Sequence, residues 1–301
     1  MSAERLETVA FSRAARARGE ADLATTVVDA AIAQVAAEDA GALAALLLER
    51  AELAVAAGDL EIADDAARRA GPLADRAGQR GQMAEAAWML GQIALRKHDL
   101  ARATYWWGQS VEIALLAEAW PIALRAQRGL AAVHRLNGDL AGAEARLRAL
   151  CADAETLEMP TELLACRLDL AHLALDQGDA AETIAQLELV LEKPELLPAL
   201  LRGEAGILRA RLLLAIDDQT TALTAIDEAL HWLRMSGDQR GLGAGLLLAG
   251  QIRLLAGQHE AAGRDLGEAL LVTERANLPE RAVVERVIAR IVGGGQSEDA
   301  G

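Results

Sequence analysis

Large aromatic side chains are scarce in this sequence. Its 301 residues include five tryptophans, one tyrosine and one phenylalanine. Sheet proteins depend on aromatic and β-branched residues, which pack well on a pleated surface. Alanine and leucine dominate here instead, and apolar residues recur three and four positions apart, as in the stretch from Leu163 to Gln177. This spacing places the apolar side chains on one face of a helix, so the sequence predicts an all-α protein.

Cysteine is also rare. Cys151 and Cys166 are too few for a disulfide framework, and their spacing matches no metal-binding motif. We expect both to be buried as small apolar side chains. A redox-sensing pair is the alternative, because the two lie on consecutive antiparallel helices at similar distances from a break near Glu158.

Positive charge and long apolar runs are lacking as well. Thirty basic residues face forty-five acidic ones, and the net charge of -15 argues against a nucleic-acid partner. No apolar run approaches the roughly 20 residues that span a bilayer, which argues against membrane insertion. The first twenty residues are charged throughout, unlike a signal peptide, so we expect a cytoplasmic protein.

Motifs for catalysis, metals and cofactors are missing too. The five histidines are scattered, and the segment that begins at His259 has Gly263 where a zinc-protease motif requires its second histidine. Glycines at 241, 243 and 245 follow no strand and do not match a dinucleotide fingerprint. We therefore expect no catalytic residues, no metal, no cofactor and no enzyme activity.

What the sequence does contain is a repeat of about forty residues. A glycine or polar residue, followed in most cases by an acidic one, recurs at this spacing and indicates a helix end followed by a new first turn. The turn positions are Gly19, Gly58, His98, Gly138, Gly178, Asp217 and Gly257. Prolines at 121, 160, 198 and 279 fall about twenty-two residues after a turn, where they mark the starts of the next hairpins.

Small residues occupy fixed places around each turn. A pair such as Leu90-Gly91 precedes the turn, and alanines stand five residues after it, at 63, 103, 143, 222 and 262. This pattern resembles the tetratricopeptide repeat from about residue 3 to residue 292. The period of forty is similar to the longer repeats of kinesin light chains and of some bacterial maltose-type regulators. Other helical-pair solenoids with periods in the forties are the alternative.

The resemblance implies a right-handed superhelical solenoid of about seven antiparallel helix hairpins. We expect residues 1–292 to form a single array, with residues 279–292 as a C-terminal capping helix. Residues 293–301 are predicted to be a disordered tail.

Three adjacent aromatic residues, Tyr105, Trp106 and Trp107, stand out against this composition. Trp107 shares its repeat position with apolar residues such as Leu147 and is predicted to be in the core. Tyr105 and Trp106 share theirs with charged residues, which predicts a second interface at these two rings. The alternative for Trp106 is that its ring lies over a side chain of the adjoining repeat.

The resemblance also implies a concave groove lined by the first helix of each hairpin. Positions at fixed distances before the turns gather several arginines there, and arginine can hold a carboxylate through two hydrogen bonds. The predicted groove residues are Trp88, Gln92, Arg96, Arg125, Arg128, Arg135, His172 and Arg211. Ala132 stands where carboxylate-clamp members of the family carry asparagine. The alternative is that these arginines pair with acidic residues on neighbouring helices.

The function predicted from these observations is a non-catalytic adaptor or scaffold. It would bind a peptide or helix of a partner protein, through an acidic or C-terminal carboxylate segment. Two alternatives stay open. One is a ligand- or peptide-sensing subunit of a regulatory system, and the other is a self-assembling structural scaffold, a homo-oligomer held by Tyr105 and Trp106.

Overall fold

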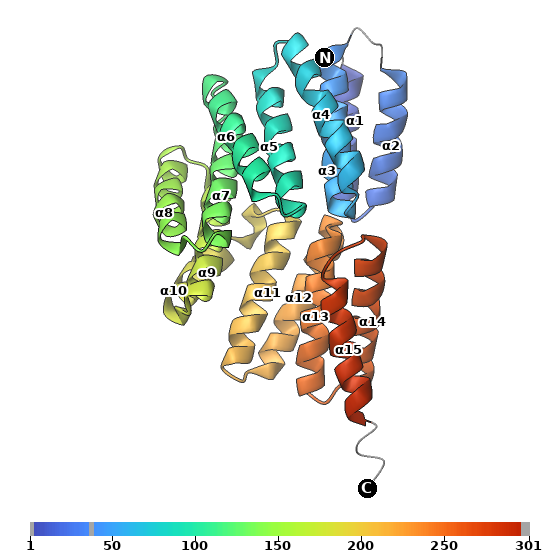
Figure 1. Ribbon diagram of the computed structural model, residues 1–301, viewed down its shortest axis with the longest axis vertical. Helices are drawn as coiled ribbons and strands as arrows, with labels where there is room; N and C mark the ends of the chain where they lie inside the picture. Colours follow the sequence, from blue (N-terminus) through green and yellow to red (C-terminus); the bar gives the residue numbers. More distant parts are fainter. Residues whose placement is uncertain (1–2, 36–38, 296–301) are drawn as a thin grey trace. The chain divides into compact units, whose positions relative to one another are not determined.

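The structure is a computed structural model that describes residues 3–35 and 39–295. Over these residues it consists of α-helices and one 3-10 turn (η1), with no strand (Figure 1). The helices are α1 (Ala3–Ala17), α2 (Ala21–Gln34), α3 (Ala40–Ala57), α4 (Leu60–Arg76), α5 (Arg80–Arg96), α6 (Leu100–Leu116), α7 (Trp120–Leu136), α8 (Leu140–Thr156), α9 (Pro160–Gln177), α10 (Ala180–Leu191), η1 (Pro194–Leu196), α11 (Ala199–Ala215), α12 (Gln219–Ser236), α13 (Gln239–Leu255), α14 (His259–Arg275) and α15 (Arg281–Gly295).

The helices fall into two compact units. The first comprises Met1–Val55 and Asp59–Pro198, and the second comprises Ala56–Gly58 and Ala199–Gly301. Within each unit, consecutive helices pack side by side as antiparallel pairs (Figure 1). These pairs give seven hairpins over the described residues, with α15 following the last one. The predicted all-helical repeat fold is thereby confirmed.

Turn chemistry explains where the hairpins bend. All seven predicted turn positions have a left-handed backbone, with φ from 59° at His98 to 86° at Gly58. Glycine adopts this conformation without strain, whereas a residue such as His98 pays roughly 1–2 kcal/mol for it. At four of the seven turns the aspartate that follows caps the next helix, as at Asp99, which accepts a hydrogen bond from the Arg102 backbone N–H at 3.0 Å. Each repeat therefore carries a helix stop and a helix start side by side.

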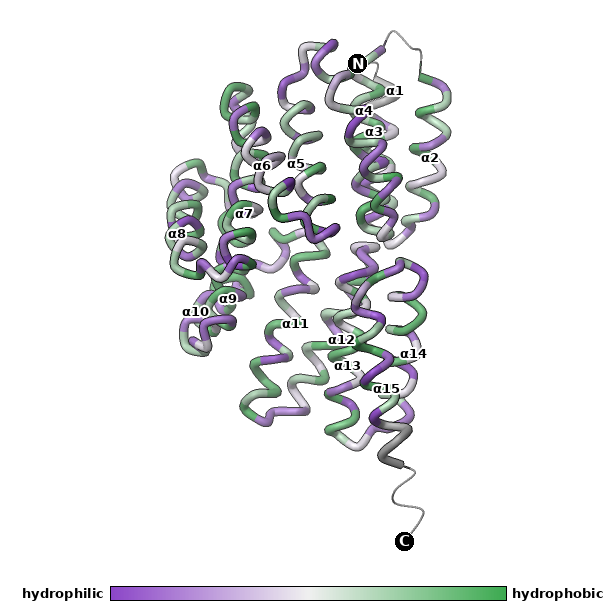
Figure 2. Tube along the Cα trace, in the orientation of Figure 1, coloured by the Kyte–Doolittle hydropathy of each residue, from purple (hydrophilic) through white to green (hydrophobic). Residues whose placement is uncertain are grey.

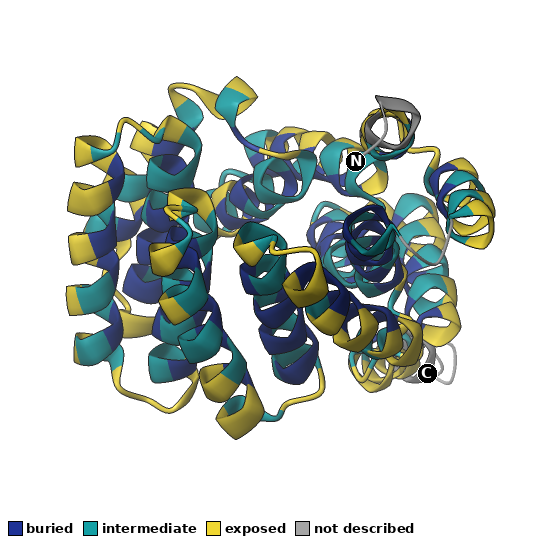
Figure 3. Cartoon of the chain, turned by 90° about the horizontal axis from the view of Figure 1, so that it is seen from above, coloured by how far each residue is buried: buried dark blue, intermediate teal, exposed yellow. Residues whose placement is uncertain are grey.

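Amphipathic helices supply the core of each unit. Apolar and polar residues are interspersed along the helices (Figure 2), and in α4 and α7 the apolar residues gather on one face. Buried residues face neighbouring helices and exposed ones face away (Figure 3). None of the described helices combines the length and the apolar character needed to cross a bilayer.

Trp107 is fully buried, as predicted, and it fills the space between three helices. The indole, carried by α6, lies against Gly91 of α5 on one side and Gly129 of α7 on the other. A Cβ atom added to either glycine would lie 2.5 Å from an indole atom. Only glycine at both positions leaves room for this ring.

The C-terminal end differs in detail from the prediction. The capping helix was predicted over residues 279–292, and α15 runs from Arg281 to Gly295. Of the predicted disordered tail, residues 293–295 belong to α15, and residues 296–301 lie outside the described residues.

Candidate functional site

The first helices of successive hairpins carry the predicted groove residues. Trp88 on α5 and Arg125 on α7 are both half-buried and contact each other directly. The guanidinium carbon of Arg125 lies 4.8 Å from the centroid of the indole ring of Trp88. A cation over an aromatic face is attracted by the electron density of the ring, and the flat guanidinium is held in one orientation.

Arg125 has a different environment from its neighbours on α7. Its Nε atom donates to the backbone oxygen of Pro121 at 3.3 Å, and no carboxylate among the described residues lies within ion-pair distance. Arg128, by contrast, donates to Asp169 at 2.6 Å, and Arg135 donates to Asp176 at 2.8 Å. These two arginines tie α7 to α9, whereas Arg125 keeps its outer N–H groups for another acceptor.

The ring beneath Arg125 also has an unused donor. The indole Nε1 of Trp88 is buried and has no hydrogen-bond partner among the residues that the structure describes. An unpaired buried donor is unfavourable, and it is one of the features that mark a site for a ligand or for water. Trp88 and Arg125 thus form a pair of donors on adjacent helices.

Glu85 lies one turn before Trp88 on α5. Burial raises the pKa of the Glu85 carboxyl, and the nearby Arg125 guanidinium partly opposes this rise. Of the other charged groups around it, Glu52 and Glu49 raise the pKa further, and Arg13 lowers it. The carboxyl is therefore held closer to its neutral form than an exposed glutamate, which leaves the charge of Arg125 only partly compensated.

A second group of charges joins the first two hairpins. The Glu49 carboxylate of α3 is buried, accepts from the hydroxyl of Ser12 at 2.8 Å, and pairs with Arg13 and Arg16 of α1 at 3.2 Å. Arg16 also pairs with Glu52 at 2.9 Å. These charges are paired within the protein and connect α1 to α3, although the buried Nε of Arg16 has no hydrogen-bond partner among the described residues.

For Arg128 and Arg135 the structure shows the alternative arrangement, in which the arginine pairs with an acidic residue on a neighbouring helix. Asp169 follows Arg128 by 41 residues, and Asp176 follows Arg135 by the same interval. This interval is one residue longer than the repeat, so each aspartate falls just outside the repeat position that holds its arginine. A search for opposite charges at the period plus one residue would have found both pairs.

The remaining predicted groove residues are spread more widely. Gln92 and Arg96 on α5 and His172 on α9 are half-buried. Arg211 is exposed on α11, which belongs to the second compact unit.

The two rings of the predicted second interface differ in exposure. Tyr105 is 59% exposed, and its ring meets that of Trp106 edge to face, with centroids 5.0 Å apart. Trp106 is half-buried, because its ring packs against the core that α3, α4 and α5 share. Tyr105 is therefore the more accessible ring of the pair.

Comparison with known proteins gives matches in structure alone. No protein-family model matches the sequence, and no curated protein matches it. Among solved structures, a Rap protein complexed with competence and sporulation factor matches with a TM-score of 0.67 at 13% identity, over 91% of this chain and 76% of that one. NprR in complex with its cognate peptide NprX matches with a TM-score of 0.63 at 11% identity, over 96% of this chain and 86% of that one. This protein has a tetratricopeptide-like repeat fold.

A tetratricopeptide-like fold leaves the chemistry open. Aspartyl phosphate phosphatase F from Bacillus subtilis matches with a TM-score of 0.64 at 11% identity, over 91% of this chain and 72% of that one. The fold is thus found in a phosphatase as well as in peptide-bound proteins, and function must be argued from side chains. Over the described residues, no group of three or more histidine, cysteine or acidic side chains is placed to hold a metal ion.

Proposed function

We propose that this tetratricopeptide-like protein is a non-catalytic, cytoplasmic peptide-binding protein whose inner helices hold a carboxylate of the ligand at Arg125. The ligand would be a short segment of a partner protein or a free peptide, with an acidic side chain or a C-terminal carboxylate at the contact. The observation that carries the proposal is the state of Arg125, which is stacked on Trp88 without a carboxylate partner while Arg128 and Arg135 are both paired.

The environment of Arg125 favours a carboxylate over other ligands. Guanidinium matches the two oxygens of a carboxylate in geometry, and stacking on Trp88 reduces the entropy lost when the ligand is held. The buried Nε1 of the same indole has no acceptor among the described residues. Phosphate-rich polymers are disfavoured by the net charge of -15.

Proteins of this fold offer a precedent for such a ligand. NprR was crystallised with its cognate peptide NprX, and a Rap protein with competence and sporulation factor. The same site would serve an adaptor that binds a partner protein or a sensing subunit that binds a free peptide. The two roles differ in the source of the peptide, not in the contact with Arg125.

A defined peptide library tests the contact. The full chain would be titrated with a pool of short synthetic peptides with free C-terminal carboxylates, and with the same pool amidated, and binding would be followed by tryptophan fluorescence and calorimetry. We expect individual peptides selected from the first pool to lose affinity for Arg125→Gln by roughly ten- to a hundredfold, since hydrogen bonds to charged groups contribute about 1.5–3 kcal/mol.

The matched control is Arg146→Gln, which removes a half-buried arginine from α8 outside the proposed contact. Equal affinities of wild type, Arg125→Gln and Arg146→Gln for the selected peptides would contradict the proposal. Light scattering on the same samples addresses the second candidate, self-association through the exposed ring of Tyr105, which would give a mass that rises with protein concentration.

A further inference from the structure

The two cysteines meet at the packing between α8 and α9. Cys151 is half-buried on α8, and Cys166 is fully buried on α9. Both belong to one core cluster with leucines of the same two helices. The pair therefore lies between the hairpin α7–α8 and the hairpin α9–α10.

A small cavity gives access to one of the two thiols. It has a volume of about 240 Å³ and is lined by Cys151, Arg148, Arg167, Gln186 and three further residues, but not by Cys166. On this measure of volume one water molecule needs roughly 10–15 Å³, so the cavity holds several water molecules and admits a molecule a little larger than water. A reagent that enters it meets Cys151 first.

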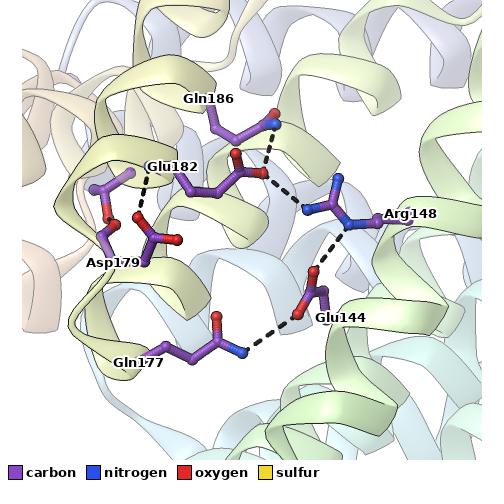
Figure 4. Close-up of polar contacts among 7 residues, drawn as sticks. Glu144, Arg148, Gln177, Asp179, Glu182 and Gln186 are labelled. Carbon is purple, nitrogen blue, oxygen red and sulfur yellow. Dashed lines mark hydrogen bonds and ion pairs between the residues drawn. The ribbon is translucent and has the colours of Figure 1, made fainter.

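Polar groups on the cavity wall are held in place by a network between α8 and α10. Figure 4 shows Arg148 reaching from α8 between Glu144 and Glu182, with 3.0 Å to each carboxylate. Gln186 donates from Nε2 to Glu182 at 3.1 Å, while its Oε1 is buried without a partner among the described residues. These contacts fix the side chains of Arg148 and Gln186 on the wall beside Cys151.

The two thiols are chemically unequal. Hydrogen bonding with the neighbouring Cys166 lowers the pKa of Cys151, and the nearby Arg167 lowers it further, against the effects of burial and of Glu155 and Asp169. The same hydrogen bond and burial raise the pKa of Cys166. Cys151 is consequently the group that becomes a thiolate, and thiolates are the reactive form of cysteine.

We propose that Cys151 and Cys166 form a peroxide-reactive dithiol, with Cys151 as the attacking group in the cavity and Cys166 as the buried resolving group. In the first step the Cys151 sulfur attacks one oxygen of hydrogen peroxide, so that an S–O bond forms and the O–O bond breaks. The leaving hydroxide takes up a proton and departs as water, which leaves a sulfenic acid on Cys151.

In the second step the Cys166 sulfur attacks the sulfur of Cys151. An S–S bond forms, the S–O bond breaks, and the departing hydroxide leaves as a second water with the proton of Cys166. The peroxide gains two electrons and the two thiols lose them. The product is a disulfide that joins α8 to α9, and thiol-disulfide exchange with a dithiol reductant reverses it.

Peroxide treatment of the full chain under native conditions tests the proposal. We expect the intact mass to fall by two hydrogen atoms, the two free thiols to disappear together, and a non-reducing digest to contain the peptides of Cys151 and Cys166 joined. Persistence of both thiols at a peroxide dose that oxidises free N-acetylcysteine would overturn the proposal, as would a gain of oxygen atoms without any disulfide.

Variants assign the two roles. In Cys166→Ala, the sulfenic acid on Cys151 should accumulate and be trapped by dimedone, whereas in Cys151→Ala the buried Cys166 should stay reduced. Arg167→Gln should slow oxidation several-fold, and Arg146→Gln on α8 should not change its rate. Thermal melts verify that each variant is folded. If a variant does not fold, the intact mass and the non-reducing digest of the wild type still show whether the disulfide forms. A dimedone adduct on Cys166 in the Cys151→Ala variant would contradict the assignment.

Discussion

Burial of a single carboxyl group, that of Glu85 on α5, makes the stability of the folded protein depend on pH. Glu85 lies beside Arg125, yet burial and the carboxylates of Glu52 and Glu49 outweigh the two nearby arginines, and the pKa of Glu85 is raised. The folded protein therefore holds this proton at pH values at which the unfolded chain has released it. Stability falls with rising pH in that window, because the folded state binds more protons than the unfolded one.

Replacing Glu85 by glutamine removes this dependence. We expect the melting temperature of Glu85→Gln to gain on that of wild type as the pH is raised from about 4, near the ordinary pKa of glutamate, to about 8. Glu228→Gln, which removes an exposed carboxylate from α12, is the control for the change in net charge. A constant difference between Glu85→Gln and wild type over this range would show that the carboxyl is not perturbed in the folded protein.

Three helices are spaced by one large ring. Trp107 of α6 lies between Gly91 of α5 and Gly129 of α7, and a methyl group at either glycine would overlap the indole. Protein interiors are close-packed, so such an overlap forces side chains or backbone to shift. The packing of these helices thus depends on the combination of residues at three positions.

A double-mutant cycle measures this dependence. Gly91→Ala should lower the free energy of unfolding by roughly 1–3 kcal/mol in the wild type, as overpacking does. In a Trp107→Leu background the same change should cost less than about 1 kcal/mol, because the smaller side chain leaves room and alanine favours the helix. Chemical denaturation of wild type, the two single variants and the double variant gives the coupling free energy between positions 91 and 107.

Gly108→Ala serves as the matched control for the cycle. Gly108 lies on the same helix as Trp107, and an added Cβ atom there would meet nothing within 4 Å. This substitution should stabilise the protein by up to about 1 kcal/mol. If Gly91→Ala behaves like Gly108→Ala in the wild type, the ring does not fill the space as described.

The helices and turns could be predicted from the sequence, because each turn depends on residues that are adjacent in the chain. The candidate site could be predicted only in part, because it depends on distances between helices. Glycine and aspartate specify a turn by their own conformational preferences, so the hairpin tips could be located from the repeat alone. The turns that carry Glu118 and Glu158 at φ 53° were indicated only by the prolines that follow them. The pairing of Arg128 with Asp169, and the freedom of Arg125 from such a pair, depend on how far one hairpin is offset against the next.

At the scale of the whole molecule, charge pairs connect several hairpins to the next segment of the same compact unit. Arg148 of α8 reaches Glu182 of α10 at 3.0 Å, and Arg240 of α13 reaches Glu280, just before α15, at 2.6 Å. In repeat proteins the free energy of folding is close to a sum of units and of interfaces between neighbours. Each compact unit should accordingly contain most of the contacts that stabilise it, and should fold without the other unit.

A fragment of residues 1–198 tests this expectation. It contains all ten helices of the first unit, the fully buried Trp107 and the contact between Arg125 and Trp88. We expect it to keep the helical circular dichroism and the blue-shifted tryptophan emission of the full chain, and to bind the same selected peptides. A fragment of residues 1–178 is the control, since it lacks α10 and leaves α9 uncovered, and it should be less stable. An unfolded 1–198 fragment would contradict the nearest-neighbour account.

The indole enclosed by two glycines also restricts how the sequence can diverge. A side chain at Gly91 or Gly129 destabilises the protein while the tryptophan at 107 is present, because it would overlap the indole. The favourable order of substitution is to replace Trp107 by a smaller residue first and then to add side chains at positions 91 and 129. Descendants of this chain that have lost Trp107 should therefore be the ones in which alanine or serine is found at positions 91 and 129.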